Sequence, residues 1–287
     1  MTTESLAGKV AIVTGGSRGL GRSMTLGLVR SGATVIAAAH IAEDFDALMK
    51  DAAGGPGKVI PLVVDLRQRE ECDRTIQAAQ DAGGVDILVN NAGLTFTYAQ
   101  PDRFRRAEPY RFWDMSDEIV ENVFAVNVLA GDRLGRRAAP LMIKRGWGRI
   151  LNVTTMLRTM HRPGHHPYGP SKAGFEMASE VWSKDIEGTG VTVNALNPGW
   201  GADTPGMADE ARAKARTGEI PRLLDPEQMV PPLLWLCSRD ADNVNGIRVD
   251  AMLWNPDLPV REAARLAARP IGLTLQPPTA EWAGDQP

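Results

Sequence analysis

The chain has 287 residues, of which 43% are hydrophobic, and its formal net charge at pH 7 is -3. It is therefore long enough to bury a large core, and its length alone allows one or two domains. Because the sequence contains no basic run, its charge supports neither a nucleic-acid partner nor binding to an anionic membrane.

Cysteine content and hydropathy indicate the compartment. The only two cysteines, Cys72 and Cys237, lie far apart, and we expect each to be a small buried hydrophobic residue in a reducing cytosol. Residues 1–7 lack the basic start and cleavage pattern of a signal peptide. No stretch approaches the roughly 18 apolar residues of a membrane span. We therefore expect a soluble cytoplasmic protein with no membrane partner.

The first predicted elements are a strand, a glycine-rich loop and a helix. Residues 9–14 form a short apolar run, residues 15–21 contain four glycines, and a helical pattern follows until Ser31 and Gly32. Glycines let the backbone approach a pyrophosphate, and the amide groups at the start of a helix face the anion. A glycine loop alone is weak evidence, but this position between strand and helix favours a dinucleotide site.

The end of the second predicted strand, residues 33–39, bears on the choice of cofactor. An acidic residue there would hold the adenosine ribose hydroxyls, but the chain has Ala39 and then His40. Together with Arg18 of the glycine loop, His40 could hold a 2′-phosphate. We therefore expect NADP in preference to NAD, although Glu43 and Asp44 follow closely and leave NAD possible.

Two further strands complete the first half of the chain. After a loop at 51–57, a strand at 58–64 ends at Asp65, which either caps a helix beginning at 67–70 or bonds the adenine amino group. A fourth strand at 84–90 enters a small Asn/Ala/Gly turn that permits close approach of a flat ligand. This alternation predicts an α/β fold with a doubly wound parallel sheet, whose strand ends line one ligand-binding edge.

The chemistry is predicted where a fifth strand, ending at 153, leads into a helix at Tyr168. Tyr168 and Lys172 are four residues apart, so they share one helix face. An ammonium near a phenol lowers its pKa and makes the pair a proton donor and acceptor. Thr155, thirteen residues before Tyr168, ends the strand where its hydroxyl points into a cleft, whereas Thr154 points to the other side. The alternative is an ordinary surface helix with this spacing by coincidence.

Over residues 6–250 the sequence resembles the short-chain dehydrogenase/reductase family, in its single-domain branch. The matching segments are residues 14–21 (TGGSRGLG), Asp65, residues 90–93 (NNAG), Asn127 within FAVNV, Thr155, residues 168–172 (YGPSK) and residues 197–199 (NPG). They occur in the family's order and spacing, and together they are highly specific.

The resemblance implies a Rossmann fold in one domain, residues 1–254, followed by an extension at 255–287. It implies an NAD(P)-dependent oxidoreductase that transfers a hydride between a nicotinamide and a carbonyl or alcohol. Tyr168 would be the general acid and base, Lys172 would bond the nicotinamide ribose, and Asn127 would hold a proton-relaying water. Thr155 stands where the family usually has Ser, which keeps the hydroxyl but adds a methyl group.

The resemblance also implies the cofactor-binding residues and the oligomeric state. The expected cofactor-binding residues are Gly15, Ser17, Arg18, Gly19, Leu20, Gly21, His40, Asp65, Leu66, Asn91, Ala92, Gly93, Tyr168, Lys172, Pro198, Gly199 and Gly201. The family commonly has a Thr five residues after Pro198; Asp203 stands there and Thr204 follows, which puts that contact in doubt. A helix capped by Ser116 and the helix after Tyr168 are the family's usual dimer faces, so a homo-oligomer, dimer or tetramer, is expected.

Several segments depart from the family pattern. Residues 95–114 are either a wall of the substrate pocket or a solvated loop anchored by aromatics, and 202–220 suggests a mobile lid. His161, His165 and His166 suggest a metal. Because Pro163 and Gly164 would interrupt any helix here, and no Cys or acidic residue joins the histidines, we expect no metal site. A last strand at 245–250 precedes a tail with a helical pattern at 260–268.

The alternative from another class is a non-catalytic nucleotide-sensing protein of the same fold, and a narrower one is an NAD-linked enzyme that oxidises alcohols. The sequence does not identify the carbonyl or alcohol substrate.

Overall fold

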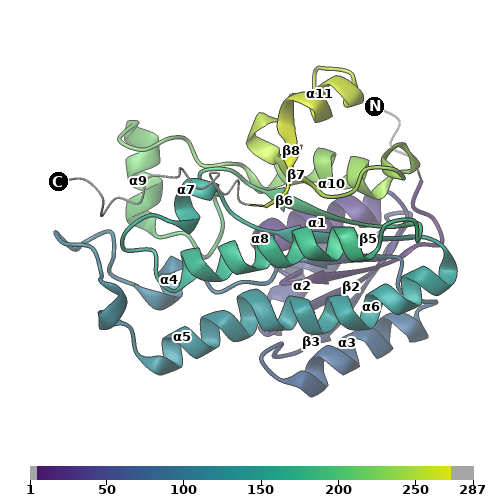
Figure 1. Cartoon of the computed structure of the whole chain (residues 1–287), viewed down its shortest axis with the longest axis horizontal. Helices are drawn as coiled ribbons and strands as arrows, with labels where there is room; N and C mark the ends of the chain where they lie inside the picture. Colours follow the sequence, from purple (N-terminus) through teal and green to yellow (C-terminus); the bar gives the residue numbers. More distant parts are fainter. Residues whose placement is uncertain (1–4, 273–287) are drawn as a thin grey trace, which may run out of the picture.

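A mostly parallel eight-stranded sheet forms the middle layer of the protein (Figure 1). The computed structural model describes residues 5–272. The strand order is β3-β2-β1-β4-β5-β6-β7-β8, and only the β7–β8 pair is antiparallel among the described strands. The strands are β1 Val10–Thr14, β2 Thr34–Ala39, β3 Lys58–Val63, β4 Ile87–Asn90, β5 Gly148–Val153, β6 Val191–Asn197, β7 Ile247–Asp250 and β8 Ala268–Pro270. The predicted doubly wound α/β fold is confirmed.

Helices cover both faces of this sheet. They are α1 Gly19–Arg30, α2 Asp44–Ala52, α3 Arg69–Asp81, α4 Phe96–Ala99, α5 Asp117–Phe124, α6 Gly131–Arg145, α7 Leu157–Met160, α8 Tyr168–Asp185, α9 Asp209–Thr217, α10 Val230–Cys237 and α11 Val260–Ala267. A π-helical segment, Ala125–Ala130, joins α5 to α6. Figure 1 shows α5, α6 and α8 side by side on one face of the sheet.

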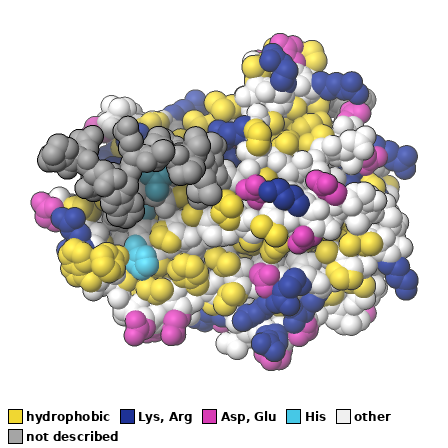
Figure 2. Space-filling model, in the orientation of Figure 1, with side chains coloured by type: hydrophobic (Ala, Val, Ile, Leu, Met, Phe, Trp, Pro, Cys, Tyr) yellow, Lys and Arg dark blue, Asp and Glu magenta, His cyan; other side chains and the backbone are white. Residues whose placement is uncertain are grey.

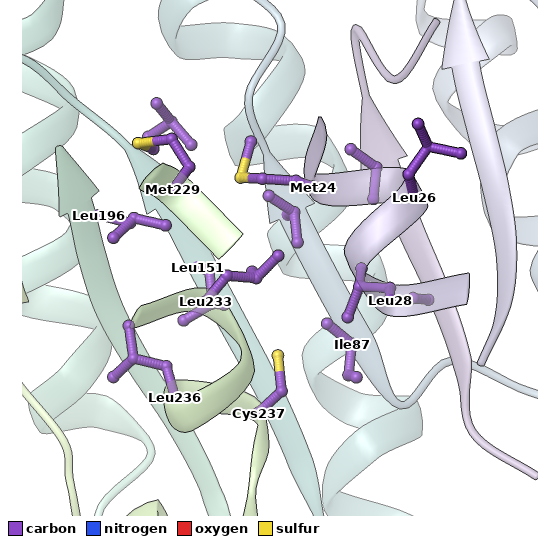
Figure 3. Close-up of a cluster of buried hydrophobic side chains, with 14 of the residues drawn as sticks. Met24, Leu26, Leu28, Ile87, Leu151, Leu196, Met229, Leu233, Leu236 and Cys237 are labelled. Carbon is purple, nitrogen blue, oxygen red and sulfur yellow. The ribbon is translucent and has the colours of Figure 1, made fainter. Parts of the chain in front are cut away.

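Each face of the sheet carries its own apolar core. One core packs side chains of α1, α2, α10 and α11 against the strands, and Figure 3 shows Met24 and Leu28 of α1 beside Leu233 of α10. The other core packs α3 and α6 against the opposite face, with Cys72 and Leu134 among its members. Every residue of β1, β4 and β6 is buried, as expected for strands covered on both sides. Both cysteines are buried and free.

Three predicted boundaries are wrong, and the contacts of the chain explain two of them. The loop at 51–57 overlaps α2, which extends to Ala52 because Phe45 and Leu48 bury one face of that helix. Helix α3 begins at Arg69 and not at 67, because the Asp65 carboxylate accepts from the Arg67 amide and from its guanidinium. The fourth strand begins only at Ile87.

The C-terminal part of the described chain completes one edge of the sheet. Strand β8 pairs with β7, so 245–250 does not hold the last strand as predicted. Three residues ending in Pro carry no strand signal, and Pro is tolerated only at an edge of this kind. The predicted helical pattern appears as α11, and Trp254 is buried beside Trp235, with 5.7 Å between ring centres. Trp282 lies outside the described residues, and the division at 254/255 stays a prediction.

Candidate active site

A phenol, a hydroxyl and an ammonium meet at the carboxyl end of β5. Thr155 follows this strand, and its side chain lies beside that of Tyr168, the first residue of α8. Lys172, one turn further along α8, is buried, and its Nζ donates to the Val153 carbonyl at 2.8 Å. Thr154 instead lies toward Arg248, whose Nη1 is 3.4 Å from its hydroxyl. The structure therefore brings Tyr168, Lys172 and Thr155 together.

Burial sets the protonation of this group. It raises the pKa of the Tyr168 phenol, and the hydrogen bond with Thr155 opposes that shift. It lowers the pKa of Lys172 to about 8. The predicted lowering of the Tyr168 pKa by Lys172 is therefore wrong for this structure, because burial of the phenol dominates and the ammonium is held by Val153.

Asn127 lies next to Lys172, in the π-helical segment. Its Oδ1 accepts from the Leu94 amide at 2.7 Å, and its Nδ2 donates to the Leu94 carbonyl and the Ser171 hydroxyl, both at 3.0 Å. A Cβ at Gly93 would lie 3.3 Å from Asn127 Oδ1 and 3.5 Å from Lys172 Nζ. Single π turns inside helices occur frequently at functional sites, but no period in the sequence pointed to this one.

The glycine loop between β1 and α1 presents a polar group with no protein partner. The Ser17 hydroxyl is buried and has no hydrogen-bond partner among the described residues. Gly19 has φ +55°, which favours glycine, and a Cβ at Gly21 would overlap the Gly15 carbonyl oxygen. Leu20, next in the loop, packs partly buried against the core.

The end of β4 is tied to the glycine loop. Asn91 Nδ2 donates to the Thr14 carbonyl at 2.8 Å, and the amides of Asn91 and Ala92 both donate to the Thr14 hydroxyl at 2.9 Å. These bonds align the carboxyl ends of two neighbouring strands, so residues 91–93 and the loop at 15–21 border the same edge.

The residues expected near an adenosine lie at the ends of β2 and β3. Asp65 binds the Arg67 guanidinium at 2.7 to 3.0 Å, which holds the pKa of Asp65 below its usual range, and His40 adds a smaller effect. Arg67 was missed by the sequence reasoning, although the Asp-x-Arg spacing could have indicated the pair. His40 is exposed. Arg18 Nε lies 3.6 Å from Asp44, and Leu66 is buried in the second core.

The segment at 95–114 packs directly on the start of α8 and the loop before it, which favours the pocket-wall interpretation. The Phe96 ring lies 4.5 Å from the Tyr168 ring and 4.4 Å from that of His165. Gln100 donates to the carbonyls of Gly164 and His166, both at 3.1 Å. Across the part of the chain that the structure describes, no three metal-ligating side chains gather.

Residues 9–215 match the family model described as short chain dehydrogenase. The chain belongs to this family. A 3-oxoacyl-[acyl-carrier-protein] reductase of Thermotoga maritima is 34% identical over 247 residues, covering 84% of this chain and 95% of the relative. The L-xylulose reductase of Mus musculus is 32% identical and covers 84% and 93%. The solved structure of a 3-oxoacyl reductase from Agrobacterium tumefaciens with NADP bound has a TM-score of 0.74 and 26% identity, covering 85% and 93%.

As a short-chain dehydrogenase, the protein is an NAD(P)-dependent oxidoreductase acting on small molecules. The comparisons give no support to a nucleotide sensor without catalysis. Within residues 5–272, no helix has both the length and the apolar character that crossing a membrane requires.

This short-chain dehydrogenase departs from the family after Pro198. Gly199 has φ +102°, and its amide donates to the Asn197 side chain at 3.1 Å, while the Gly201 carbonyl accepts from Leu224. Asp203, which replaces the family Thr, turns to Arg212 at 2.7 Å. Thr204 instead lies against the glycine loop, since a Cβ at Gly19 would come within 3.1 Å of it.

A buried ionic network that the sequence did not reveal supports Thr155. Arg248 of β7 binds Glu176 of α8 at 2.5 Å and Asp250 at 3.2 Å, and its Nη2 donates to the Thr155 carbonyl at 2.5 Å. Glu176 and Arg248 are 72 residues apart in sequence, so no local pattern indicates that they meet.

Proposed function

We propose that this short-chain dehydrogenase is a carbonyl reductase in which Tyr168 acts as general acid. The position of the Thr155 side chain beside the Tyr168 phenol, one helical turn from the buried Lys172, is the observation that supports this role most directly. Bound NADPH would supply the hydride that reduction requires. The residues of this chain would orient the carbonyl and move the proton.

In this proposal two hydroxyls hold the substrate oxygen. Thr155 and Tyr168 each donate a hydrogen bond to it, which favours the negative charge that develops there. The raised pKa of Tyr168 keeps the phenol protonated at neutral pH, so it can deliver its proton. Lys172, with its pKa of about 8, titrates near neutral pH and replaces that proton through Asn127 and a bound water. Alcohol oxidation reverses these steps.

Replacing Tyr168 by Phe tests the role of the phenol. We expect kcat for ketone reduction to fall by roughly 100-fold or more, because the proton donor is lost. Binding of the cofactor, measured by fluorescence titration, should change less than threefold. Tyr98→Phe is the matched control, because that phenol is exposed and accepts from Asn122. Near-normal turnover by Tyr168→Phe would reject the role.

The glycine loop fits a pyrophosphate, and the charged residues near it support NADP as the preferred cofactor. The unpartnered Ser17 hydroxyl and the close approach that Gly21 permits would hold the phosphates at the start of α1. The remaining expected contacts, from residues 91–93 and 198–201, border the same edge. Arg18 and His40 would hold a 2′-phosphate, and the related reductase from Agrobacterium tumefaciens has NADP bound.

Arg18→Met separates the two cofactors. It should lower kcat/KM with NADPH by roughly 10- to 100-fold, as expected for a charge-assisted contact, and leave that with NADH nearly unchanged. Arg22→Met is the control, because Arg22 is hydrogen-bonded to Asp51, whereas Arg18 makes only a longer contact of 3.6 Å with Asp44. A wild-type enzyme that prefers NADH would contradict the proposal.

We also propose that the enzyme is a cytoplasmic homo-oligomer. Leu129 and Ile143 near α6 and Val181 of α8 are exposed, and Figure 2 shows hydrophobic side chains on the face that these helices form. A second copy would cover them. Val181→Glu should shift the protein to a smaller species in light scattering, whereas Met49→Glu on α2 should not. A monomeric wild type would contradict this, and cell fractionation tests the compartment.

A further inference from the structure

Segment 95–114 places one guanidinium near the catalytic phenol without a carboxylate beside it. Arg105 pairs with Glu210 at 2.6 Å, and Arg106 lies 3.8 Å from Asp102. Arg103 is half-buried, yet it pairs with no carboxylate among residues 5–272. Burial, and then the charge of Arg162, lowers the pKa of Arg103. A cation in this position is costly unless an anion joins it.

The position of Arg103 relates it to the proposed chemistry. Its Cζ lies 4.3 Å from the centre of the Phe96 ring, and that centre lies 4.5 Å from the centre of the Tyr168 ring. The guanidinium therefore lies no farther from the Tyr168 ring than the sum of these two distances. A substrate with its carbonyl at Tyr168 and its chain extended past Phe96 would have Arg103 within its reach.

Neutral acceptors hold the guanidinium and leave part of it free. Its Nη1 donates to Gln100 Oε1 at 3.2 Å, and its Nη2 is 3.3 Å from His165 Nε2. His165 Nδ1 is 2.9 Å from the Thr159 carbonyl, so Nδ1 carries the proton and Nε2 accepts. Burial lowers the pKa of His165 to about 4, which keeps this ring neutral. Of the five N–H groups of Arg103, three have no described partner.

We propose that Arg103 binds a carboxylate of the substrate, so that the enzyme reduces short oxo acids. The fork of free N–H groups matches a planar carboxylate, and the guanidinium supplies the opposite charge. The proposal rests on the proposed function, because it places the reacting carbonyl at Tyr168. Arg103 thereby selects the substrate, while Tyr168 and Thr155 carry the reaction.

Matched pairs of ketones test the selection. With NADPH, 4-oxopentanoate and 5-oxohexanoate are compared with their methyl esters, which keep the carbonyl and remove the charge. We expect wild-type kcat/KM for at least one acid to exceed that for its ester by roughly 10- to 100-fold. Arg103→Met should bring kcat/KM for the acid to within about threefold of that for its ester, and should leave kcat/KM for the ester nearly unchanged. Arg103→Lys keeps the charge and loses the fork, so its ratio of kcat/KM for acid and ester should lie between those of the wild type and Arg103→Met.

A matched control and two opposing outcomes make the test decisive. Arg106→Met removes an arginine from the same segment whose charge Asp102 already balances, and it should keep the wild-type ratio. Equal kcat/KM for acids and esters in the wild type overturns the proposal. An equal loss for both in Arg103→Met also overturns it, since that result assigns Arg103 to anchoring the loop.

A binding measurement separates this proposal from the proposed function. Reduction of the esters alone would leave the carbonyl reductase in place and reject the carboxylate site. If no ketone is reduced, the proposed function fails, and pentanoate with NADP then tests Arg103. Pentanoate should raise the unfolding temperature of the wild type but not of Arg103→Met. The absence of that rise in the wild type rejects the carboxylate site.

Discussion

The ammonium of Lys172 lies where water hardly reaches it, and this controls the pH at which it carries a proton. Its pKa is lowered to about 8 by burial, while the pKa of Tyr168 is raised. Lys172 is therefore protonated below about pH 8 and neutral above it. Tyr168 keeps its proton on both sides of pH 8, because its pKa is raised. The first of the two groups to lose its proton as pH rises is thus the lysine.

We accordingly expect kcat/KM for reduction to fall as pH rises through about 8, because Lys172 no longer replaces the proton of Tyr168. The profile is measured from pH 6 to 10 with saturating NADPH. Lys172→Arg, which stays charged over this range, should lose that limb whatever its absolute rate. A wild-type rate that stays flat to pH 9.5 would show that Lys172 does not take part.

The hydroxyl of Thr155 gives a second prediction at this scale. Thr155→Val keeps the shape of the side chain and removes the donor, so kcat should fall by roughly 100-fold. Thr155→Ser keeps the hydroxyl and loses one methyl group, so kcat should stay within a few fold of the wild type while KM values shift. Steady-state rates with one ketone compare the three proteins. Wild-type turnover by Thr155→Val would place the donor elsewhere.

Local spacing explains which residues of the candidate site could be predicted. Tyr168 and Lys172 are one helical turn apart, and the glycine loop lies between its strand and helix, so short segments of sequence carry both signals. The contacts of Arg248 with Glu176 and of Arg103 with His165 join residues that only the fold brings close. Asp250 and Gln100 lie near these arginines in sequence, but nothing there indicates the distant partners.

At the scale of elements, the loop before α8 is held by an uncharged histidine. His165 is buried between Phe96, the Thr159 carbonyl and Arg103, and burial lowers its pKa from 6.5 to about 4. Between these two values the unfolded chain binds a proton that the native protein does not. The free energy of unfolding therefore falls as pH drops from about 6.5 to about 4.

We expect the wild type to lose on the order of 3 kcal/mol of stability from this residue across that range. His165→Gln should show a smaller loss between pH 7 and pH 4.5 in urea unfolding, whatever its stability at pH 7. His161→Gln is the control, because His161 is exposed on the same loop. Equal pH dependence in the wild type and His165→Gln would show that the ring is charged or flexible in the native protein.

The elements themselves were predicted where burial leaves a continuous apolar run. Strands β1 and β2 read as such runs, and the predicted cap of α5 is confirmed, since Ser116 accepts from the Ile119 amide. The π-helical segment and β8 were missed. Both depend on tertiary contacts, namely the bonds of Asn127 with Leu94 and Ser171 and the pairing of β8 with β7.

At the scale of the whole molecule, the network around Arg248 joins distant parts of the chain. It links β7 to Glu176 of α8 and to the Thr155 carbonyl, and Asp250 extends it to Arg269 of β8 and to Asn197 before the Pro198 turn. Arg248 and Glu176 are 2% and 1% exposed. The edge that β8 completes is thus connected through charged groups to the backbone of the candidate active site.

Arg248→Met should destabilise the protein by about 3 to 5 kcal/mol, because it leaves Glu176 buried without its cation, while Asp250 keeps Arg269. In the folded fraction of this variant, kcat should fall, because the Thr155 carbonyl loses its donor. Cofactor affinity should change little. Glu176→Gln combined with Arg248→Met should recover part of the stability, because one unpaired charge is then removed. Urea unfolding and kcat at low temperature measure both effects.

Arg149→Met is the matched control for this last variant. Arg149 is also fully buried, but it lies at the start of β5 and pairs with Asp242, which is 47% exposed. Water can solvate Asp242 after the change, so the loss of stability should be smaller and kcat should stay near the wild-type value. Equal effects of the two variants on kcat would mean that Arg248 acts on global stability alone. A loss of kcat confined to Arg248→Met would instead tie the sheet edge to the geometry of Thr155.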